Sequence, residues 1–485
     1  MNNPNGMYQV GYCYYLGIGV KMNKHKAFKY YLKAAKAGNS MGIFKTAICY
    51  YYGVGVKKNK DKYYYWTEKN SNYGKCAHCN KYNTKGAWCQ TCDPDITVQE
   101  WTSGNKDIDD CVKGFQLRTT GYERMIEWIP FDRLNNIEKI GEGGFGSVFS
   151  ATWLDGIRKI EFDYDNDKFI KAREPSSVVA LKTLSGSRKN SLDFLNEFSN
   201  HIKCRLYGSE LKMYGLTQNT ETNEYFMVFQ YANNGSLYKF LRTKFQDITW
   251  QTKLKLLKDI SLDLRHIHNA GYIHADFHSG NILQDEEYEG ISKSIKSYIS
   301  DLGLSKKKNR NDLEGGTYGV LPYVAPEVLL GQKFTPAADI YSFGVIMSEM
   351  STGQRPFDGR PFDLSLTLDI YRGLRPEFAP GTPDCYIELA KQCMDSDPQK
   401  RPDALDIWVK CNEWNEIMKS SDNANEIKNQ FLEADKIVKA LPIISPKHPD
   451  FMYTSKIINT QKISNAIEAL PSNPIDSVEI LLIIE

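Results

Sequence analysis

Near the middle of the chain, a polar loop follows a long helical pattern and reads His274-Ala275-Asp276-Phe277-His278-Ser279-Gly280-Asn281-Ile282-Leu283. The helical pattern covers residues 250–269, and its apolar stripe consists of Leu254, Leu257, Ile260, Leu264 and Ile267. Two short motifs follow further along, Ser300-Asp301-Leu302-Gly303 and Ala325-Pro326-Glu327. The order of these motifs sets the fold expected for the whole central region.

A glycine-rich stretch upstream has the pattern Gly-x-Gly-x-x-Gly and reads Ile140-Gly141-Glu142-Gly143-Gly144-Phe145-Gly146-Ser147-Val148. On its own, this pattern is equally typical of a dinucleotide-binding motif, in which the glycines open a helix. Here the chain continues as Val148-Phe149-Ser150-Ala151-Thr152-Trp153, which alternates and is rich in β-forming residues. The glycines are therefore expected at the tip of a β-hairpin that closes over phosphate groups.

A predicted strand then ends in a lysine, in the stretch Val179-Ala180-Leu181-Lys182. Fifteen residues later, Glu197 lies within a helical pattern. A buried ammonium group needs an anionic partner to stay charged and aimed at the α- and β-phosphates of a nucleotide. Lys182 and Glu197 are therefore interpreted as an ion pair.

With the glycine loop, VALK, HxDxxxxN, DLG and APE in this order, residues 131–414 resemble a eukaryotic protein kinase. The resemblance implies an α+β, two-lobed fold, with a small antiparallel sheet in the N-terminal lobe and a mostly helical C-terminal lobe. It also implies ATP- and Mg²⁺-dependent phosphorylation of protein substrates. The GxxxYxAPE frame and a similarity to the tyrosine-kinase-like group favour Ser or Thr over Tyr as the acceptor.

The resemblance assigns a role to each matching residue. Asp276 corresponds to the catalytic aspartate that accepts or orients the proton of the substrate hydroxyl, with Lys182 and Glu197 as the ion pair. Asn281 and Asp301 correspond to the two Mg²⁺ ligands. The implied ATP-binding residues are Ile140, Gly141, Gly143, Gly144, Gly146, Val148, Ala180, Lys182, Gln230, Ala232 and Leu283.

Two further matches are expected to be structural. Asp339 lies in a stretch that resembles the buried helix anchoring the catalytic loop, and Arg401 resembles the partner of Glu327. An unpaired buried charge at either end of the second pair would cost about 3–5 kcal/mol. Loss of Glu327 or Arg401 would therefore reduce activity by reducing folding.

A pseudokinase scaffold, whose nucleotide pocket only stabilises a docking platform, is the alternative class of protein. A degenerate kinase usually lacks the lysine, the catalytic aspartate or a metal ligand, whereas Lys182, Glu197, Asp276, Asn281 and Asp301 are all present. These five side chains are expected to converge in a single cleft. The complete set favours catalysis, although the presence of motifs does not prove turnover.

Four positions depart from the kinase pattern, and one of them, Leu302, replaces the usual phenylalanine of DFG with another apolar side chain. Ala275 replaces the arginine that in many kinases clamps a phosphorylated activation segment, which argues against activation by a loop phosphate. His278 stands where serine/threonine kinases usually carry lysine, and Val320 replaces their usual threonine. Both of these changes weaken the case for Ser or Thr as the acceptor.

The first 72 residues repeat with a shift of 36 residues. The stretch Cys13-Tyr14-Tyr15 matches Cys49-Tyr50-Tyr51, and Gly17-Ile18-Gly19-Val20-Lys21 matches Gly53-Val54-Gly55-Val56-Lys57. Each unit predicts a pair of helices that buries its apolar face on the next unit. The pattern resembles Sel-one-like repeats, which implies binding of protein partners. The alternative is that the helices only pack against the rest of the chain.

Two Cys-x-x-Cys pairs follow, Cys76-Ala77-His78-Cys79 and Cys89-Gln90-Thr91-Cys92, separated by nine residues. This spacing can supply four thiolates in tetrahedral geometry, and four soft ligands suit Zn²⁺. Four protein ligands leave no open coordination position, so a structural site is expected, with His78 only flanking it. Four uncoordinated cysteines are the alternative.

Composition excludes several classes of protein. Among the 485 residues, 41% are hydrophobic and 25% are charged, which excludes a wholly disordered, collagenous or membrane-embedded chain. Eleven cysteines and a polar amino terminus without a long apolar run predict a cytoplasmic protein that is neither exported nor inserted in a membrane. Residues 1–72 carry a net charge of +10. They lack the alternation of aromatic and basic residues that is typical of nucleic-acid-binding proteins, so nucleic-acid binding is not expected.

The sequence thus predicts five regions. They are helical repeats over residues 1–72, a cysteine knuckle over 73–95, a linker with one helix over 96–130, a kinase domain over 131–414 and a partly helical tail over 415–485. Within the tail, a helix is predicted over residues 416–440 and is ended by Leu441-Pro442. No chemistry is assigned to the rest of the tail, which includes His448-Pro449-Asp450.

Overall fold

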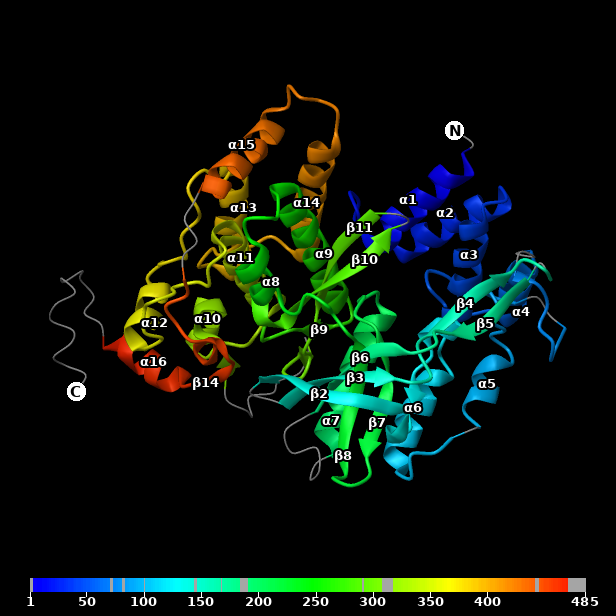
Figure 1. The fold of residues 1–485 in the computed structure, drawn as a ribbon. Helices are drawn as coiled ribbons and strands as arrows, with labels where there is room; N and C mark the ends of the chain where they lie inside the picture. Colours follow the sequence, from blue (N-terminus) through cyan, green and yellow to red (C-terminus); the bar gives the residue numbers. More distant parts are fainter. Residues whose placement is uncertain are drawn as a thin grey trace. The chain divides into compact units, whose positions relative to one another are not determined.

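The structure is a computed structural model of the 485-residue chain. It describes residues 3–69, 73–80, 83–99, 101–143, 146–166, 168–183, 191–289, 292–307, 317–440 and 445–469. The chain divides into two compact units (Figure 1). Unit 1 consists of Met1–Glu142, Gly146–Ile202 and Lys212–Tyr231, and unit 2 consists of Gly143–Phe145, Lys203–Leu211 and Ala232–Glu485.

Unit 1 begins with two helical hairpins, which confirms the predicted helix pairs. Their helices are α1 (Pro4–Leu16), α2 (Lys24–Lys36), α3 (Ser40–Tyr52) and α4 (Lys60–Glu68). The side chains of Asn23 and Asn59 cap α2 and α4 at positions related by the 36-residue shift. Gly55 has a φ of 68°, and an added Cβ would lie 2.0 Å from the carbonyl oxygen of Lys24. Only glycine therefore allows the second turn to lie against the start of α2.

A six-stranded sheet forms the second half of unit 1, with the strand order β1-β7-β8-β6-β3-β2. The strands are β1 (Glu127–Trp128), β2 (Leu134–Gly143), β3 (Gly146–Trp153), β6 (Ser177–Lys182), β7 (Met213–Asn219) and β8 (Glu224–Gln230). Pairing is antiparallel between β3, β6, β8 and β7, and β1 joins β7 in parallel. Trp153, Leu181 and Val228 belong to the apolar core on one face of the sheet.

Further helices and a hairpin belong to unit 1, except for the end of one helix, because Lys203–Leu211 belongs to unit 2. Helices α5 (Asp93–Thr97) and α6 (Lys106–Gln116) follow the cysteine region, and α7 (Ser191–Leu206) follows β6. A hairpin that the sequence analysis did not predict lies between β3 and β6, formed by β4 (Arg158–Asp163) and β5 (Lys168–Arg173). The rings of Phe115 on α6 and Phe198 on α7 pack edge to face, with centroids 5.8 Å apart.

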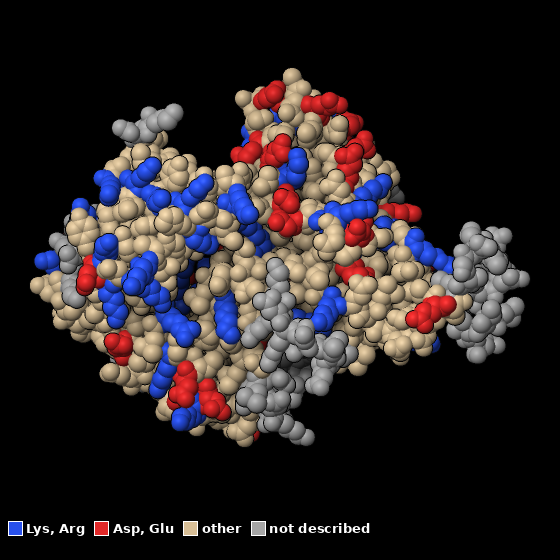
Figure 2. All heavy atoms as spheres, turned by 180° about the vertical axis from the view of Figure 1, so that it is seen from behind, with Lys and Arg blue, Asp and Glu red and all other residues tan. Residues whose placement is uncertain are grey.

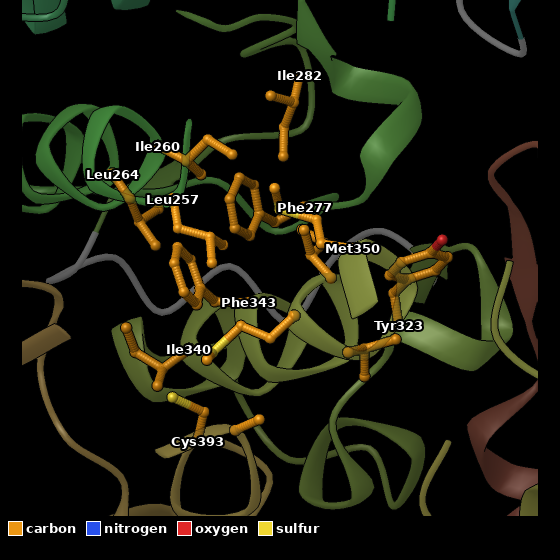
Figure 3. Close-up of a cluster of buried hydrophobic side chains, with 14 of the residues drawn as sticks. Leu257, Ile260, Leu264, Phe277, Ile282, Tyr323, Ile340, Phe343, Met350 and Cys393 are labelled. Carbon is orange, nitrogen blue, oxygen red and sulfur yellow. The ribbon is translucent and has the colours of Figure 1, made fainter. Parts of the chain in front are cut away.

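Unit 2 is mostly helical. Its helices are α8 (Leu237–Lys244), α9 (Trp250–Asn269), α10 (Pro326–Leu329), α11 (Pro336–Thr352), α12 (Leu364–Tyr371), α13 (Asp384–Cys393), α14 (Ala404–Lys419), α15 (Glu426–Ala440) and α16 (Thr460–Glu468). The predicted helix over residues 250–269 is confirmed as α9. Its apolar stripe is fully buried, and Figure 3 shows Leu257 and Leu264 pointing toward Phe343 of α11.

Among the described residues of unit 2, short strands form three antiparallel pairs. They are β10 (Ile282–Glu289) with β11 (Ser292–Ile299), β12 (Lys306–Lys307) with β9 (Tyr272–Ile273), and β13 (Thr317–Gly319) with β14 (Lys456–Ile458). Short 3-10 helices in the described part of the chain are Tyr122–Arg124, Phe131–Arg133, Ser279–Asn281, Leu321–Tyr323, Pro398–Lys400 and Asp450–Tyr453. The last strand pair joins the C-terminal region to the segment between Asp301 and Glu327.

The helix predicted over residues 416–440 is instead two helices. Helix α14 ends at Lys419, and α15 begins at Glu426. Between them, the run Ser420-Ser421-Asp422-Asn423-Ala424-Asn425 is rich in residues that prefer caps and turns to a helix interior. The side chain of Asn425 accepts the backbone N–H of Lys428, whose own ammonium donates to the carbonyl of Ser420. Leu441 and Pro442 lie outside the described residues.

No helix in the described part of the chain combines the length and the apolar character needed to cross a membrane. Residues 1–72 contain twelve Lys but only two acidic residues. Figure 2 shows Lys and Arg spread over the face of the repeat helices, with few Asp or Glu among them. These charges coat the outside of helices whose apolar residues meet in their own core.

Candidate active site

The predicted pair of Lys182 and Glu197 is in direct contact in unit 1. Lys182 is the last residue of β6, and its Nζ donates to Oε1 of Glu197 on α7 at 2.7 Å. The side chain of Glu197 is 2% exposed and that of Lys182 is 12% exposed. A hydrogen bond between two charged groups that are largely buried is strong, and it fixes the direction of the ammonium group.

His201 is a third member of this cluster that the sequence analysis did not predict. Its Nε2 lies 3.7 Å from Oε1 of Glu197, one helical turn away on α7. Its ring packs against the ring of Phe229 on β8, with centroids 5.0 Å apart. The i,i+4 spacing of Glu197 and His201 within a helical pattern was the signal that could have found it.

The proposed ATP-binding residues of unit 1 lie on and around one face of the sheet. In the ladder, Val148 lies opposite Lys182, and Ala180 lies opposite Ser150. Residues that are opposite or two apart share a face of the sheet, so Val148, Ala180 and Lys182 point the same way. Gln230 ends β8, and its N–H donates to the carbonyl of Lys212 at 2.8 Å.

The glycine loop joins two neighbouring strands of that sheet, as predicted. Ile140, Gly141 and Gly143 belong to the end of β2, and Gly146 begins β3. Ile140 is 41% exposed. Gly144 lies outside the described residues. The chain therefore continues as a strand after the glycines, which rules out the helix of a dinucleotide-binding motif.

In unit 2, Asp276 and Asn281 belong to one tight loop. The Nδ2 of Asn281 donates to the backbone carbonyl of Asp276 at 2.9 Å and lies 3.4 Å from its Oδ2. The carbonyl of Asn281 accepts the N–H of Ser300, so Asn281 and Asp301 lie at the same end of the β10–β11 pair. Ala232 and Leu283 also belong to unit 2, and Leu283 forms an isolated antiparallel β-bridge with Ser236.

Asn281 and Asp301 carry side-chain oxygens of the kind that bind a magnesium ion. Because Nδ2 of Asn281 faces the loop, its side-chain oxygen is the atom that can coordinate a cation. Asp301 has a left-handed φ of 61°, and its Oδ1 accepts the N–H of Gly303 at 3.3 Å. Amide and carboxylate oxygens are the ligands that Mg²⁺ prefers.

The electrostatic surroundings keep Asp276 ionised. Asp276 is 7% exposed, and burial alone would raise its pKa. His278, whose Nε2 lies 3.7 Å from Oδ2, and the hydroxyl of Ser455 together hold the pKa of Asp276 below its usual value. Within the described part of the chain, Oδ1 of Asp276 is buried and has no hydrogen-bond partner.

Asp339 holds the backbone of the catalytic loop, as the resemblance implied. Its Oδ2 accepts the N–H of His274 at 2.8 Å, and its Oδ1 accepts the N–H of Ala275 at 3.0 Å. His268 Nε2 also lies 2.8 Å from Oδ2. Ala275 needs this support, because its φ of 64° is unfavourable for a residue with a side chain.

Sequence reasoning missed a second anchor beneath this loop. Glu349 on α11 accepts hydrogen bonds from Ser279 at 2.8 Å and from Tyr323 at 2.6 Å. Burial raises the pKa of Glu349 and also that of Tyr323. A glutamate inside an otherwise apolar helical pattern was the available signal, since such a residue needs polar partners.

A family model of protein tyrosine and serine/threonine kinases matches residues 134–410, which is more than half of the chain. The chain belongs to this protein kinase family. Models of the Sel1 repeat match residues 4–39 and 40–69, in agreement with the two helical hairpins that precede the kinase domain.

Three similar proteins carry kinase names. The chain is 29% identical over 296 residues to the probable serine/threonine-protein kinase roco5 of Dictyostelium discoideum. It is 32% identical over 300 residues to a putative serine/threonine-protein kinase/receptor of Acanthamoeba polyphaga mimivirus, and 31% identical over 266 residues to MDIS1-interacting receptor like kinase 2 of Arabidopsis thaliana. The matches cover 58%, 61% and 50% of this chain, but only 10%, 16% and 24% of those proteins.

The four predicted cysteine ligands lie together in one cluster. They precede the kinase domain in the sequence. The Sγ atoms of Cys76, Cys79, Cys89 and Cys92 all lie within 4.8 Å of one another. Four sulfurs at about 2.3 Å from a tetrahedral ion would lie about 3.8 Å apart, so the cluster fits a metal ion. Burial raises the pKa of the Cys89 thiol to about 11, and hydrogen bonds with Cys79 and Cys76 act in the same direction. A bound cation would offset this effect.

Hydrogen bonds and an ion pair surround the cysteine cluster. The N–H of His78 donates to Sγ of Cys76 at 3.4 Å, so His78 flanks the site through its backbone. The carboxylate of Asp93 accepts the N–H of Cys89 at 2.6 Å and pairs with Lys171 of β5, also at 2.6 Å. These contacts connect the cluster to the β4–β5 hairpin.

Proposed function

We propose that the chain is a protein kinase that transfers the γ-phosphate of ATP to Ser or Thr hydroxyls of protein substrates. The observation that carries this proposal is the 2.7 Å ion pair between Lys182 and Glu197. In protein kinases this pair must be in place for phosphoryl transfer. A scaffold that only bound partners would have no need of a buried ion pair, which is costly to desolvate.

The remaining site residues take the following roles in the proposal. Asp276 orients the substrate hydroxyl and accepts its proton, and its lowered pKa keeps it in the ionised form that this role requires. Asn281 and Asp301 hold Mg²⁺, which supplies positive charge beside the phosphates. ATP is held by Ile140, Gly141, Gly143, Gly144, Gly146, Val148, Ala180, Lys182, Gln230, Ala232 and Leu283. Their convergence in one cleft stays a prediction.

The names of the relatives support Ser or Thr as the acceptor, since two of those compared are called serine/threonine-protein kinases. The Sel1 repeats would bind protein partners or substrates, because stacked helical repeats present extended binding surfaces. Zinc is the metal that best suits four cysteine thiolates, so we assign a structural Zn²⁺ to the cysteine cluster.

Phosphate transfer by the purified chain tests the proposed activity. We expect the full chain to label casein from γ-labelled ATP with Mg²⁺, and Asp276→Asn to reduce the rate by at least about 10²-fold. Asp422→Asn is a matched control, because Asp422 lies on the exposed turn between α14 and α15. Equal labelling by the wild-type and Asp276→Asn chains would favour the pseudokinase scaffold instead.

A further inference from the structure

The C-terminal region of unit 2 returns to the catalytic loop of the same unit. We call residues 445–469 the tail segment. Its strand β14 pairs antiparallel with β13, in the register Thr317 with Ile458, Tyr318 with Ile457 and Gly319 with Lys456. Strand β13 belongs to the activation segment (301–327), which begins at Asp301 and ends at Glu327 of the APE motif. Addition of a strand to an exposed edge is a common way of binding an extended peptide.

The residue before β14 brings a hydroxyl group to the catalytic aspartate. Ser455 Oγ donates to Oδ2 of Asp276 at 2.5 Å. This length is typical of a hydroxyl bound to a carboxylate, about 2.5–2.7 Å. The neighbouring hydroxyl of Thr454 instead donates to the carbonyl of Phe451 within its own turn. Ser455 therefore occupies the position that the proposed function gives to an acceptor hydroxyl.

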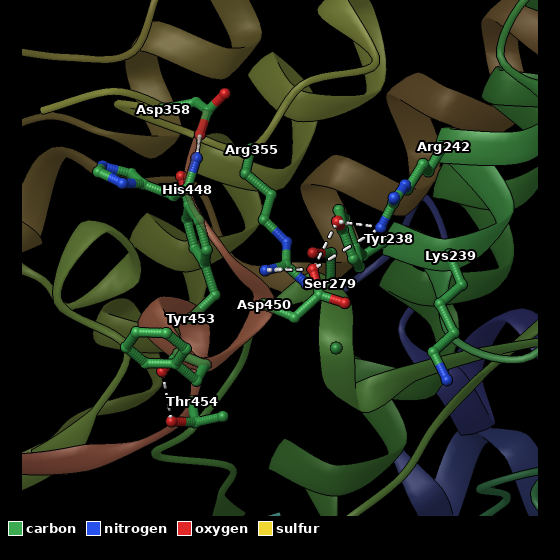
Figure 4. A network of polar contacts seen from close by, with 12 residues as sticks. Tyr238, Lys239, Arg242, Ser279, Arg355, Asp358, His448, Asp450, Tyr453 and Thr454 are labelled. Atoms are coloured by element: carbon green, nitrogen blue, oxygen red, sulfur yellow. Dashed lines mark hydrogen bonds and ion pairs between the residues drawn. The ribbon is translucent and has the colours of Figure 1, made fainter. Parts of the chain in front are cut away.

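Contacts upstream of Ser455 hold the tail segment in this position. The carboxylate of Asp450 accepts the hydroxyl of Tyr238 at 2.8 Å and lies 3.9 Å from Arg242 and 3.7 Å from Arg355 (Figure 4). Tyr453 is 6% exposed, and its hydroxyl donates to the carbonyl of Pro356. These contacts place a charged anchor and an aromatic anchor just before the serine.

Further anchors lie at both ends of the tail segment. At its start, the carboxylate of Asp358 accepts the N–H groups of Lys447 and His448 at 2.8 and 2.9 Å. At its end, α16 packs against α10 and α12, with Ile463 buried in the core of unit 2. Within the segment, Ile457 is 68% exposed, so the strand between the anchors lies on the surface.

We propose that the tail segment is bound as an intramolecular substrate, and that Ser455 is a phosphoacceptor whose modification opens the site to other proteins. This inference rests on the proposed kinase function. In the transfer, the bond between the γ-phosphorus of ATP and its bridging oxygen breaks, and a bond from that phosphorus to Ser455 Oγ forms. The hydroxyl proton passes to the carboxylate of Asp276, and ADP leaves.

The same geometry explains why phosphorylation would release the tail segment. A phosphate on Ser455 would bring about two negative charges beside the buried carboxylate of Asp276, which repels them. The hydroxyl would also no longer have a proton to donate to Oδ2. Release of the tail segment by phosphorylation needs no arginine before Asp276, in agreement with the alanine found at position 275.

Site mapping tests the acceptor role. The purified full chain is incubated with γ-labelled ATP and Mg²⁺ over a dilution series, and the labelled peptides are identified by mass spectrometry. We expect label on Ser455 at a fractional rate independent of chain concentration, no label there in Ser455→Ala or Asp276→Asn, and unchanged labelling in Thr454→Ala. Casein labelling without any label on Ser455 would overturn the inference and leave the proposed function intact.

A charge-matched pair of variants tests the release. Ser455→Glu adds a negative charge beside Asp276, whereas Ser455→Gln has the same size and no charge. If about a tenth of the Ser455→Gln chains and nearly all of the Ser455→Glu chains have the tail segment released, Ser455→Glu should phosphorylate casein about tenfold faster than Ser455→Gln. Equal rates for the two variants would contradict release by charge.

Hydrogen exchange provides a readout that does not depend on catalysis. In the full chain without nucleotide, backbone amides of residues 317–319 and 456–458 should exchange slowly, because the two strands pair. Exchange at the rate of an unstructured peptide would overturn the docking of the tail segment, whatever the activity of the chain. Protected amides in a chain that labels neither casein nor Ser455 would contradict both the acceptor role and the proposed function.

Discussion

At the scale of single residues, the interior of unit 2 depends on a bidentate ion pair. Arg401 Nη1 and Nη2 donate to the two carboxylate oxygens of Glu327 at 2.8 and 2.7 Å. The side chain of Arg401 is 0% exposed and that of Glu327 is 7% exposed. The guanidinium also donates to the carbonyl of Ala337, at the start of α11. The pair therefore fixes the APE motif relative to the helix that carries Asp339.

Glu327→Gln should destabilise unit 2 by about 3–5 kcal/mol, because it leaves the buried charge of Arg401 without an anion. The exposed pair of Glu416 and Lys419 provides the matched control. Glu416→Gln should change the free energy of unfolding by less than about 0.5 kcal/mol. Urea unfolding of both variants measures the difference, and similar losses in the two would show that burial of the pair has little influence.

A second residue-scale prediction concerns pH. His266 is 8% exposed on α9, and burial lowers its pKa from 6.5 to about 4. Between these values the folded chain binds fewer protons than the unfolded chain, so stability is lost as the pH falls from 6.5 to about 4. The difference between the two pKa values corresponds to about 3 kcal/mol.

His266→Gln should therefore flatten the pH dependence of stability in this window. Urea unfolding at several pH values between 4 and 7, with hydrogen exchange in α9 to report on unit 2, measures the slope. His25→Gln is the control substitution, since His25 is exposed on α2 and belongs to unit 1. A slope that persists in His266→Gln would assign the acid sensitivity to other groups.

At the scale of elements, the helices show how far local patterns lead. Helix α9 has the predicted bounds, because its apolar stripe repeats every three or four residues over almost four turns. The same approach missed the break between α14 and α15, where a run of six residues, five of them polar, interrupts a helical pattern. It also missed the β4–β5 hairpin, whose strands are only half buried and carry several charges. Local patterns predict an element well where an apolar stripe repeats at a regular spacing without interruption.

The cysteine cluster is the element-scale feature most open to a direct test. We expect one Zn²⁺ per chain in freshly purified, reduced protein. Cys89→Ser should lose the metal and destabilise the neighbouring β4–β5 hairpin by several kcal/mol, because metal binding and folding are coupled. Cys385→Ser, on α13 of unit 2, should retain the metal. Metal analysis together with hydrogen exchange of residues 73–99 and 158–173 measures both effects, and a metal-free wild-type chain would reject the zinc assignment.

At the scale of the whole molecule, sequence reasoning reached the residues that carry motifs and missed those that act only through folding. Asp276 and Asn281 could be identified because their spacing is fixed within one loop. Ser455 lies 179 residues from Asp276, in a stretch without any motif, so only the folded chain brings its hydroxyl to the carboxylate. Glu349 was missed for the same reason, because its partners Ser279 and Tyr323 come from two other elements.

Nucleotide binding supplies the prediction that involves the whole chain. The proposed ATP and Mg²⁺ ligands are divided between the two units, with Lys182 in unit 1 and Asp301 in unit 2. A ligand that binds only the folded chain stabilises it by about 2.7 kcal/mol at a hundred times its dissociation constant. ATP with Mg²⁺ should therefore slow hydrogen exchange in both β6 and β11 and raise the unfolding temperature.

Asp301→Asn distinguishes the stabilising effect of Mg²⁺ from that of ATP in this experiment. The variant should lose most of the additional stabilisation that Mg²⁺ gives over ATP alone, because a carboxamide is a weaker ligand for a hard cation than a carboxylate. Asp422→Asn should respond as the wild-type chain does. Protection confined to one unit would contradict the division of ligands, and an equal Mg²⁺ effect in Asp301→Asn would remove Asp301 from the metal site.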